Sequence, residues 1–249
     1  MKRPWLIKAG GELLATPATR AKILKGLKKI QATERVVFMH GGGPQIEAEL
    51  KRNNVEARFV GGRRITTPEA MVHVERILSG EINKGLAAEL LRLRVNAVGL
   101  SCRDGGLVIG QPIDGLARAA RPWKVNVGLL ETLVEAGYVP IVSSVGSDKK
   151  GNAVNINADD AASAVAVGLK AGRLVFLTNV AGVRDALGRR IPVLRIDAVD
   201  RLIKDGVITG GMIPKVQSAR NAILKGVGEV DIVNGLEGVR VDHGTRILK

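Results

Sequence analysis

Cysteine is almost absent from this chain, since Cys102 is the single one among 249 residues. One cysteine excludes an internal disulfide and a zinc site built from several cysteines. Aromatic residues are also scarce, at 2%, which argues against the stacking surfaces that bind single-stranded nucleic acid. No apolar run approaches the roughly 20 residues that span a bilayer, and residues 1–5 lead into a strand-like segment rather than a secretory signal. We therefore expect a cytoplasmic protein that binds neither nucleic acid nor a membrane.

Acidic residues are few relative to basic ones: 24 Asp and Glu against 38 Lys and Arg give a net charge of +14. Such an excess favours anionic partners, among them nucleotides, dicarboxylates and acidic proteins. A basic surface that is simply solvated needs no macromolecular partner, and we favour that interpretation. The length and the apolar fraction of 45% are sufficient for one large α/β domain or for two lobes that share a sheet.

Several common catalytic signatures are missing. The chain has no G-x-x-x-x-G-K-[ST] phosphate loop, no complete G-x-G-x-x-G and no G-x-S-x-G elbow. The histidines, His40, His73 and His243, are scattered, and no cluster of Cys and His has the spacing of metal ligands. We therefore expect no metal bound by protein side chains, and neither a phosphate-loop enzyme nor a serine hydrolase.

Strand-like and helix-like segments alternate along the chain, a pattern typical of α/β folds with a largely parallel sheet. Residues 158–169 are apolar on nearly all sides, which predicts a buried helix, and we place a change of lobe near residue 158. Two short apolar runs, 97–100 and 107–109, flank residues 103–106, which we interpret as a hairpin turn. Residues 112–124 have the composition of a basic loop.

Two glycine-rich turns follow the first two predicted strands. Gly10 and Gly11 follow the strand at residues 5–7, and Gly41-Gly42-Gly43 follows the strand at residues 36–39. Glycine lets backbone N–H groups approach an anion closely, and the start of the next helix adds a favourable dipole. One glycine pair alone would be a tight turn and nothing more. Two such turns at the carboxyl ends of parallel strands favour anion binding.

Charged and polar residues stand beside these and similar turns. Lys8 lies inside an otherwise apolar strand, where a lysine is costly to bury unless it meets an anion. Lys215 follows Gly210 and Gly211 in the first turn of a predicted helix, where it opposes the helix dipole. Asn155 and Asp159 stand at a strand-to-helix junction. Taken one at a time, each has a simpler structural explanation as a turn or cap residue.

Taken together, these segments resemble the amino acid kinase family over nearly the whole chain. The matching blocks are Ile7-Lys8-Ala9-Gly10-Gly11, His40-Gly41-Gly42-Gly43-Pro44-Gln45-Ile46, Arg64-Ile65-Thr66, Asn83-Lys84, Leu100-Ser101, Asp104-Gly105, Asn155-Ile156-Asn157-Ala158-Asp159, Leu177-Thr178-Asn179-Val180-Ala181-Gly182-Val183 and Gly210-Gly211-Met212-Ile213-Pro214-Lys215. Any one block is weak, but their shared order and spacing make the resemblance specific.

The resemblance implies a three-layer αβα sandwich around a mainly parallel open sheet. Residues 1–158 would bind the amino-acid substrate and form a dimer, and residues 159–249 would bind ATP. Mg²⁺ would arrive with ATP, held through its phosphates. The implied catalytic residues are Lys8 and Lys215, which would stabilise the transferring phosphoryl group, and Asp159, which would hold both lysines. The implied substrate-binding residues are Gly42, Gly43, Arg64 and Asn155, and the implied ATP-binding residues are Gly10, Gly11, Thr178, Asn179, Val183, Gly210 and Gly211.

The activity that the resemblance implies is ATP-dependent phosphorylation of the γ-carboxylate of N-acetyl-L-glutamate to an acyl phosphate, in arginine biosynthesis. Three departures from the family pattern bear on the substrate: Arg63 beside Arg64, the basic segment 118–124, and Asn179 in place of an aspartate. One alternative is therefore a kinase for aminoadipate or glutamate linked to an acidic carrier protein. Another, from a different class, is a nucleotide-responsive binding protein without turnover.

The resemblance also bears on assembly. Arginine-inhibited members of the family carry an extra N-terminal helix that links dimers into hexamers, whereas here a strand begins at about residue 4. We therefore expect a homodimer that free arginine does not inhibit. The expected interface is the helix pair at residues 70–93, through its apolar residues Met71, Val74, Ile77, Leu78 and Ile82.

Overall fold

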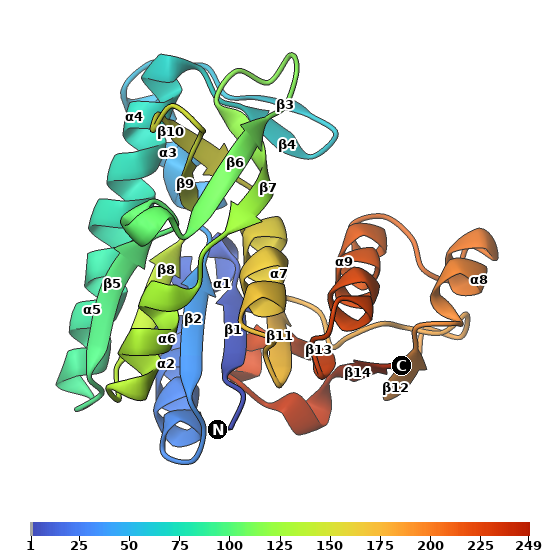
Figure 1. Ribbon diagram of the computed structural model, residues 1–249. Coiled ribbons are helices and arrows are strands. Elements are labelled where there is room, and N and C mark those ends of the chain that lie inside the picture. Colours follow the sequence, from blue (N-terminus) through green and yellow to red (C-terminus); the bar gives the residue numbers. More distant parts are fainter. Residues whose placement is uncertain (1) are drawn as a thin grey trace.

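The computed structural model describes residues 2–249, and one large sheet runs through its centre (Figure 1). Within that range the sheet has eight strands, in the spatial order β12 (Val193–Arg195), β14 (Thr245–Leu248), β13 (Glu229–Asn234), β11 (Arg173–Thr178), β1 (Trp5–Ala9), β2 (Val36–His40), β8 (Val139–Ser143) and β5 (Ala97–Ser101). Neighbours are parallel except β13 and β14, which pair antiparallel. The predicted mainly parallel sheet is confirmed.

Helices cover both faces of this sheet (Figure 1). In chain order they are α1 (Gly11–Ala15), α2 (Pro17–Gln31), α3 (Gly43–Arg52), α4 (Pro68–Glu75), a π-helix (Arg76–Ile82), α5 (Asn83–Arg92), α6 (Gly128–Glu135), α7 (Ala158–Gly168), α8 (Val199–Lys204) and α9 (Met212–Leu224), with 3₁₀ turns at Asp104–Gly106, Gly235–Glu237 and Val241–His243. The cores are built by α1, α2 and α5 on one face and by α6, α7 and α9 on the other. The expected αβα sandwich is therefore present. No helix within residues 2–249 has the length and apolar character needed to cross a membrane.

The sheet strands are apolar on both sides because both faces are covered. In β1, Leu6 belongs to the core that α7 shares, whereas its neighbour Ile7 belongs to the core that α2 shares. Helix α7 packs over this centre with small residues such as Ala161 and Ala162, which are fully buried. The buried helix predicted at residues 158–169 is confirmed, and its first turn carries Asp159 above the carboxyl end of β1.

A smaller β structure sits beyond the carboxyl ends of the central strands (Figure 1). Strands β6 (Val108–Pro112), β7 (Ala119–Val125), β9 (Val145–Ser147) and β10 (Ala153–Ile156) close into a barrel, and β3 (Arg58–Val60) pairs with β4 (Arg63–Ile65) as a separate hairpin.

Two local expectations are wrong in this region. Residues 103–106 do not join a hairpin, because β5 belongs to the central sheet and β6 to the barrel. The Asp104 carboxylate accepts hydrogen bonds from the backbone N–H and the hydroxyl of Ser101, and this turn redirects the chain between the two sheets. The expected loop at residues 112–124 is wrong in its second half: residues 113–118 connect β6 to β7, but residues 119–124 belong to β7, which pairs with β6 and β10.

A third apolar cluster lies where α3, α4 and the π-helix meet. Met71, Val74, Ile77 and Leu78 are at most 4% exposed in it, and Ile82 packs against it. These residues therefore cannot form the dimer surface that the sequence suggested. The helical pattern identified the buried face correctly, but that face packs inside the subunit.

Candidate active site

The two glycine-rich turns meet at the carboxyl ends of β1 and β2. A Cβ atom on Gly11 would stand 2.6 Å from Gly42 Cα and 2.7 Å from Gly43 N, so no side chain fits there. A Cβ atom on Gly42 would likewise stand 2.5 Å from Ile82 Cδ1. Gln45 Nε2 donates a 3.0 Å hydrogen bond to the Gly11 carbonyl and ties the turns together. Helices α1 and α3 therefore begin side by side, with their free N–H groups at one edge of the sheet.

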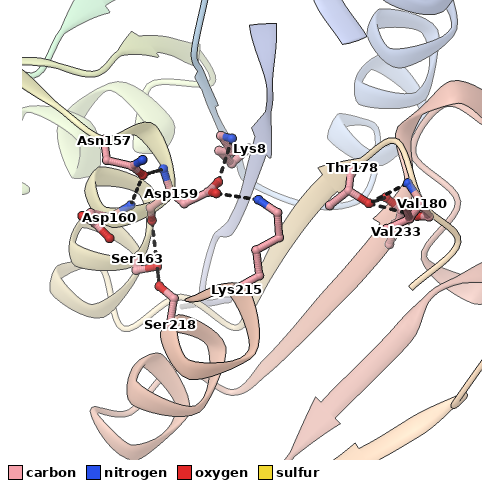
Figure 2. A network of polar contacts seen from close by, with 10 residues as sticks. All are labelled: Lys8, Asn157, Asp159, Asp160, Ser163, Thr178, Val180, Lys215, Ser218 and Val233. Atoms are coloured by element: carbon pink, nitrogen blue, oxygen red, sulfur yellow. Dashed lines mark hydrogen bonds and ion pairs between the residues drawn. The ribbon is translucent and has the colours of Figure 1, made fainter. Parts of the chain in front are cut away.

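Three charged side chains converge beside these turns (Figure 2). Lys8, from β1, places its Nζ 2.7 Å from Asp159 Oδ1, and Lys215, from α9, places its Nζ 2.6 Å from Asp159 Oδ2. The Lys8 side chain is 9% exposed, against 22% for Asp159 and 26% for Lys215. The structure thus brings together the three residues that the resemblance assigned to catalysis, although they lie far apart in the sequence.

The lysines determine the charge of this group. Burial alone would raise the pKa of Asp159, but the charges of Lys8 and Lys215 and their hydrogen bonds hold that pKa well below its ordinary value. Asp159 is therefore ionised at neutral pH and neutralises one lysine charge. The second lysine charge has no counter-charge within the trio and is available to an anionic ligand.

A chain of hydroxyl groups fixes α9 against α7 (Figure 2). Ser163 Oγ donates to the Asp159 carbonyl oxygen at 2.9 Å and lies 2.6 Å from Ser218 Oγ. Because Ser218 follows Lys215 by three residues, both lie on the same side of α9. The Asn157 side chain caps α7 by accepting from the backbone N–H groups of Asp159 and Asp160. These contacts position Asp159 and Lys215 together.

One cavity, of about 210 Å³, opens beside the glycine turns. Residues that line it include Lys8, Gly10, Gly11, Gly42, Gly43, Ile46, Phe59, Arg63, Arg64, Leu78, Ala119, Ala120, Asn155, Ile156 and Asp159. Its walls are therefore mainly apolar or glycine, with three cationic side chains, those of Lys8, Arg63 and Arg64. This composition fits a small ligand that has an apolar part and more than one anionic group.

Arg64, like Lys8, is a buried cation of this cavity, at 7% exposure. Its Nη2 lies 3.1 Å from Glu47 Oε1, its guanidinium stacks 4.6 Å from the centre of the Phe59 ring, and its buried Nη1 has no hydrogen-bond partner within residues 2–249. Burial lowers the pKa of Arg64 from its usual range, and Glu47 opposes that shift. A buried N–H without a partner is costly, so a ligand carboxylate there would satisfy it.

Other polar residues brace the cavity. Asn155 Nδ2 donates to Thr66 Oγ1 at 3.0 Å, which ties β10 to the segment after the β3–β4 hairpin. Arg63 forms a 2.6 Å ion pair with Asp160, so the same hairpin is also tied to α7. The sequence offered no signal for the roles of Asp160 or Phe59, because their partners lie in distant segments.

A second cavity, of about 380 Å³, adjoins the first. Its lining includes Thr178, Asn179 and Lys215, and it shares Lys8, Gly10, Gly11 and Gly43 with the first cavity. Asn179 Nδ2 lies 3.4 Å from Glu12 Oε2, while the Thr178 hydroxyl donates to the Val180 carbonyl (Figure 2). The boundary between the two cavities is therefore made of a lysine and backbone N–H groups. Such a boundary can hold two anionic ligands end to end and neutralise charge between them.

Three of the residues expected to bind nucleotide lie elsewhere in the structure. Val183 is 1% exposed, and its backbone N–H donates to Thr245 Oγ1 at 2.9 Å. Gly210 and Gly211 form an exposed turn before α9. None of the three lines either cavity as described for residues 2–249, and their contact with nucleotide stays a prediction. Over the same residues, no group of three or more His, Cys, Asp or Glu could hold a metal ion.

The fold and the site define a class of α/β proteins with two adjoining cavities at the carboxyl ends of the central strands. The chain belongs to the amino acid kinase family, whose model matches residues 3–234. It is 44% identical to the acetylglutamate kinase of Geobacillus kaustophilus, covering all of this chain and 98% of that protein, and 38% identical to that of Endomicrobium trichonymphae, covering 98% of each.

Solved structures show the same architecture. A protein from Streptococcus mutans UA159 superposes with a TM-score of 0.86 at 31% identity, covering 100% of this chain and 99% of that one. Carbamate kinase from Giardia lamblia, bound to AMP-PNP, superposes with a TM-score of 0.77 at 20% identity, covering 100% of this chain and 99% of that one. The second likeness is one of fold alone.

Proposed function

We propose that this chain is an acetylglutamate kinase. It transfers the γ-phosphoryl group of ATP to the γ-carboxylate of N-acetyl-L-glutamate, and the products are an acyl phosphate and ADP in arginine biosynthesis. The observation that carries this proposal is the position of Lys8, which lines both cavities and shares Asp159 with Lys215. The acetylglutamate kinases that match the whole chain at 38–44% identity support the choice of substrate.

The chemistry needs little from the protein beyond positioning and charge. A γ-carboxylate has a pKa of about 4.3 and is ionised at neutral pH, so no general base is required. One carboxylate oxygen forms a bond to the γ-phosphorus as the bond from that phosphorus to the ADP oxygen breaks. Negative charge spreads over the phosphoryl oxygens during the transfer. Lys8 and Lys215 stand where that charge develops, and Asp159 holds both ammonium groups without needing to move a proton.

The substrate is assigned to the first cavity, within the proposed lobe of residues 1–158. Arg64 would bind a carboxylate through its unpartnered Nη1, and Gly42, Gly43 and Asn155 would complete the site. The apolar walls suit the acetyl group and the methylene chain.

ATP is assigned to the second cavity, which the proposed lobe of residues 159–249 helps to form. Gly10, Gly11, Thr178, Asn179 and Lys215 line it. Gly11 would donate its backbone N–H to phosphate oxygens at the boundary of the two cavities. Mg²⁺ would be held mainly by ATP phosphates and water, as is usual for this ion, since the described side chains offer no cluster of ligands.

The ion pairs within the subunit favour a free substrate over one linked to a carrier protein. Of the three arginines that could have met an acidic carrier, two already have carboxylate partners: Arg63 pairs with Asp160 at 2.6 Å, and Arg118 approaches Asp148 at 3.7 Å. Arg121 alone forms no ion pair within residues 2–249. The intact arrangement around Asp159 likewise favours turnover over a binding role alone.

We also propose that the protein is a homodimer, with an interface different from the one first expected. On α4 and α5 the exposed large apolar residues are Val72, at 49% exposure, and Leu91, at 55%. The neighbouring strand β5 pairs with β8 alone among residues 2–249, so one of its edges is open. This outer surface is the candidate interface, and light scattering on the wild type and a Leu91→Glu variant tests it. The cytoplasmic location expected from the sequence stays a prediction.

Trapping the acyl phosphate tests the function. The purified protein is incubated with ATP, Mg²⁺ and hydroxylamine, and the hydroxamate is measured with N-acetyl-L-glutamate, with free aminoadipate, or with carrier-linked aminoadipate. We expect hydroxamate with N-acetyl-L-glutamate at a kcat/KM well above that for either aminoadipate form. A preference for the carrier-linked substrate would replace this proposal with the carrier alternative, and no hydroxamate with any acceptor would support the binding protein.

A further inference from the structure

A separate groove lies between β7, α7 and α9, away from the two cavities of the active site. Its volume is about 490 Å³, within the range of roughly 300–1,000 Å³ that is typical of small-molecule sites. Its walls include Trp123 and Val125 from β7 and Val167 from α7. Neither of the ligands proposed above occupies this groove.

The charges of the groove favour an anion. Arg121 and Lys225 line it from opposite elements, are exposed, and form no ion pair with any residue in 2–249. Asp160 is its acidic residue, but the 2.6 Å ion pair with Arg63 already neutralises that carboxylate. The groove therefore has two uncompensated positive charges at its rim.

The remaining lining residues favour a ligand whose anionic group is attached to a flat apolar ring. Trp123 is 53% exposed, and Lys149 stacks on its ring 4.0 Å from the centre. The chain has only two tryptophans, and this one exposes its ring next to two cations that have no ion-pair partner. Ser163 and Ser218 also line the groove, so an occupant would touch the hydroxyl pair that joins α7 to α9.

We propose that this groove binds a small aromatic acid, with its carboxylate or phosphate between Arg121 and Lys225 and its ring against Trp123. The site is distinct from both active-site cavities, since the groove shares no lining residue with either. Its occupancy does not depend on phosphoryl transfer, so the proposal stands or falls independently of the proposed function.

Phenyl phosphate is a suitable probe, and the fluorescence of Trp123 reports its binding to the full chain. Titrations are done with excess ADP to occupy the nucleotide cavity, and inorganic phosphate and phenol are titrated separately. We expect a saturable change with phenyl phosphate, at concentrations well below those needed for phosphate or phenol alone. A Trp123→Phe variant should lose the signal.

Charge variants distinguish the groove from non-specific binding. Lys225→Ala should weaken phenyl phosphate binding roughly tenfold, the scale of one hydrogen bond to a charged group. Lys124→Ala is the matched control, because Lys124 is next to Trp123 on β7 and does not line the groove, and it should bind as the wild type does. The proposal is overturned if the titration does not saturate, if phosphate alone binds equally well, or if the two variants weaken binding equally.

Discussion

Lowering the pH should destabilise this protein through one buried imidazole, that of His40 at the end of β2. His40 is fully buried; its Nδ1–H donates to the Gly41 carbonyl at 3.1 Å, and its Nε2 accepts from Asn83 Nδ2 at 3.1 Å. A second proton on Nε2 would face the N–H group of Asn83. Burial, aided by the charge of Lys8 and opposed by the bond to Gly41, lowers the pKa of His40 from 6.5 to about 4.

The lowered pKa determines both the sign and the size of the effect of pH on the free energy of unfolding. The unfolded chain takes up a proton near pH 6.5, whereas the folded chain resists until about pH 4, so the contribution of His40 is complete above pH 6.5 and is lost as the pH falls towards 4. The gap between the two pKa values corresponds to roughly 3 kcal/mol, a large part of a typical stability of about 5–15 kcal/mol.

Urea unfolding at pH 7.0, 5.5 and 4.0 measures the effect. The free energy of unfolding of the wild type should fall by roughly 3 kcal/mol more than that of a His40→Asn variant over this range. His243→Asn is the control, because the His243 side chain is 47% exposed, and it should follow the wild type. Asp159, whose pKa is lowered in the folded chain, contributes equally to the wild type and to the variant, so its contribution cancels in the comparison. Equal losses in the wild type and in His40→Asn would refute this assignment.

Three further variants test the positioning of the site. Arg64→Ala should raise KM for the acyl amino acid at least tenfold and leave KM for ATP nearly unchanged, because Arg64 lines the first cavity alone; equal rises in both would contradict its role. Arg63→Asp should raise the same KM by up to about fivefold, the scale of an exposed ion pair, and adding Asp160→Arg should restore it; no rescue would exclude the pair. Ser218→Ala should lower kcat roughly threefold to tenfold, the scale of one lost hydrogen bond, and Ser218→Thr should restore kcat. A change in thermal stability without a change in kcat would indicate that this hydrogen bond is purely structural.

The arrangement of the central elements could be predicted from the sequence because local signals determine it. These signals are the apolar strands, the glycine turns and Pro44 at the start of α3. Each of them determines the conformation of only the few residues around it. Helix α7 was likewise evident from its continuous run of small apolar residues, and the motif blocks then indicated Lys8 and Lys215. In the structure the glycine spacing at Gly11 and Gly42 has a steric reason, since the two turns touch.

The parts that could not be predicted depend on long-range pairing. Strand β7 is basic and contains Pro122, and its pairing with β6 shifts register between Ile109 and Gly110, so neither alternation nor a short turn marked it. The helical period of α4 located an apolar face but could not say whether α3 or a second subunit covers it. Arg63 and Asp160 are 97 residues apart, and nothing in either local sequence indicates the other.

The central claim is that two lysines sharing Asp159 stabilise the transferring phosphoryl group. The most direct test is the rate at which the Lys215→Met variant forms hydroxamate. Lys28→Met, on the exposed face of α2, is the control for the loss of one positive charge, and circular dichroism confirms folding of both. The account predicts that kcat for N-acetyl-L-glutamate falls roughly 10²–10³-fold in Lys215→Met, the scale for losing one preorganised transition-state contact, and stays at the wild-type value in Lys28→Met. A folded Lys215→Met with kcat within a few-fold of wild type would contradict it.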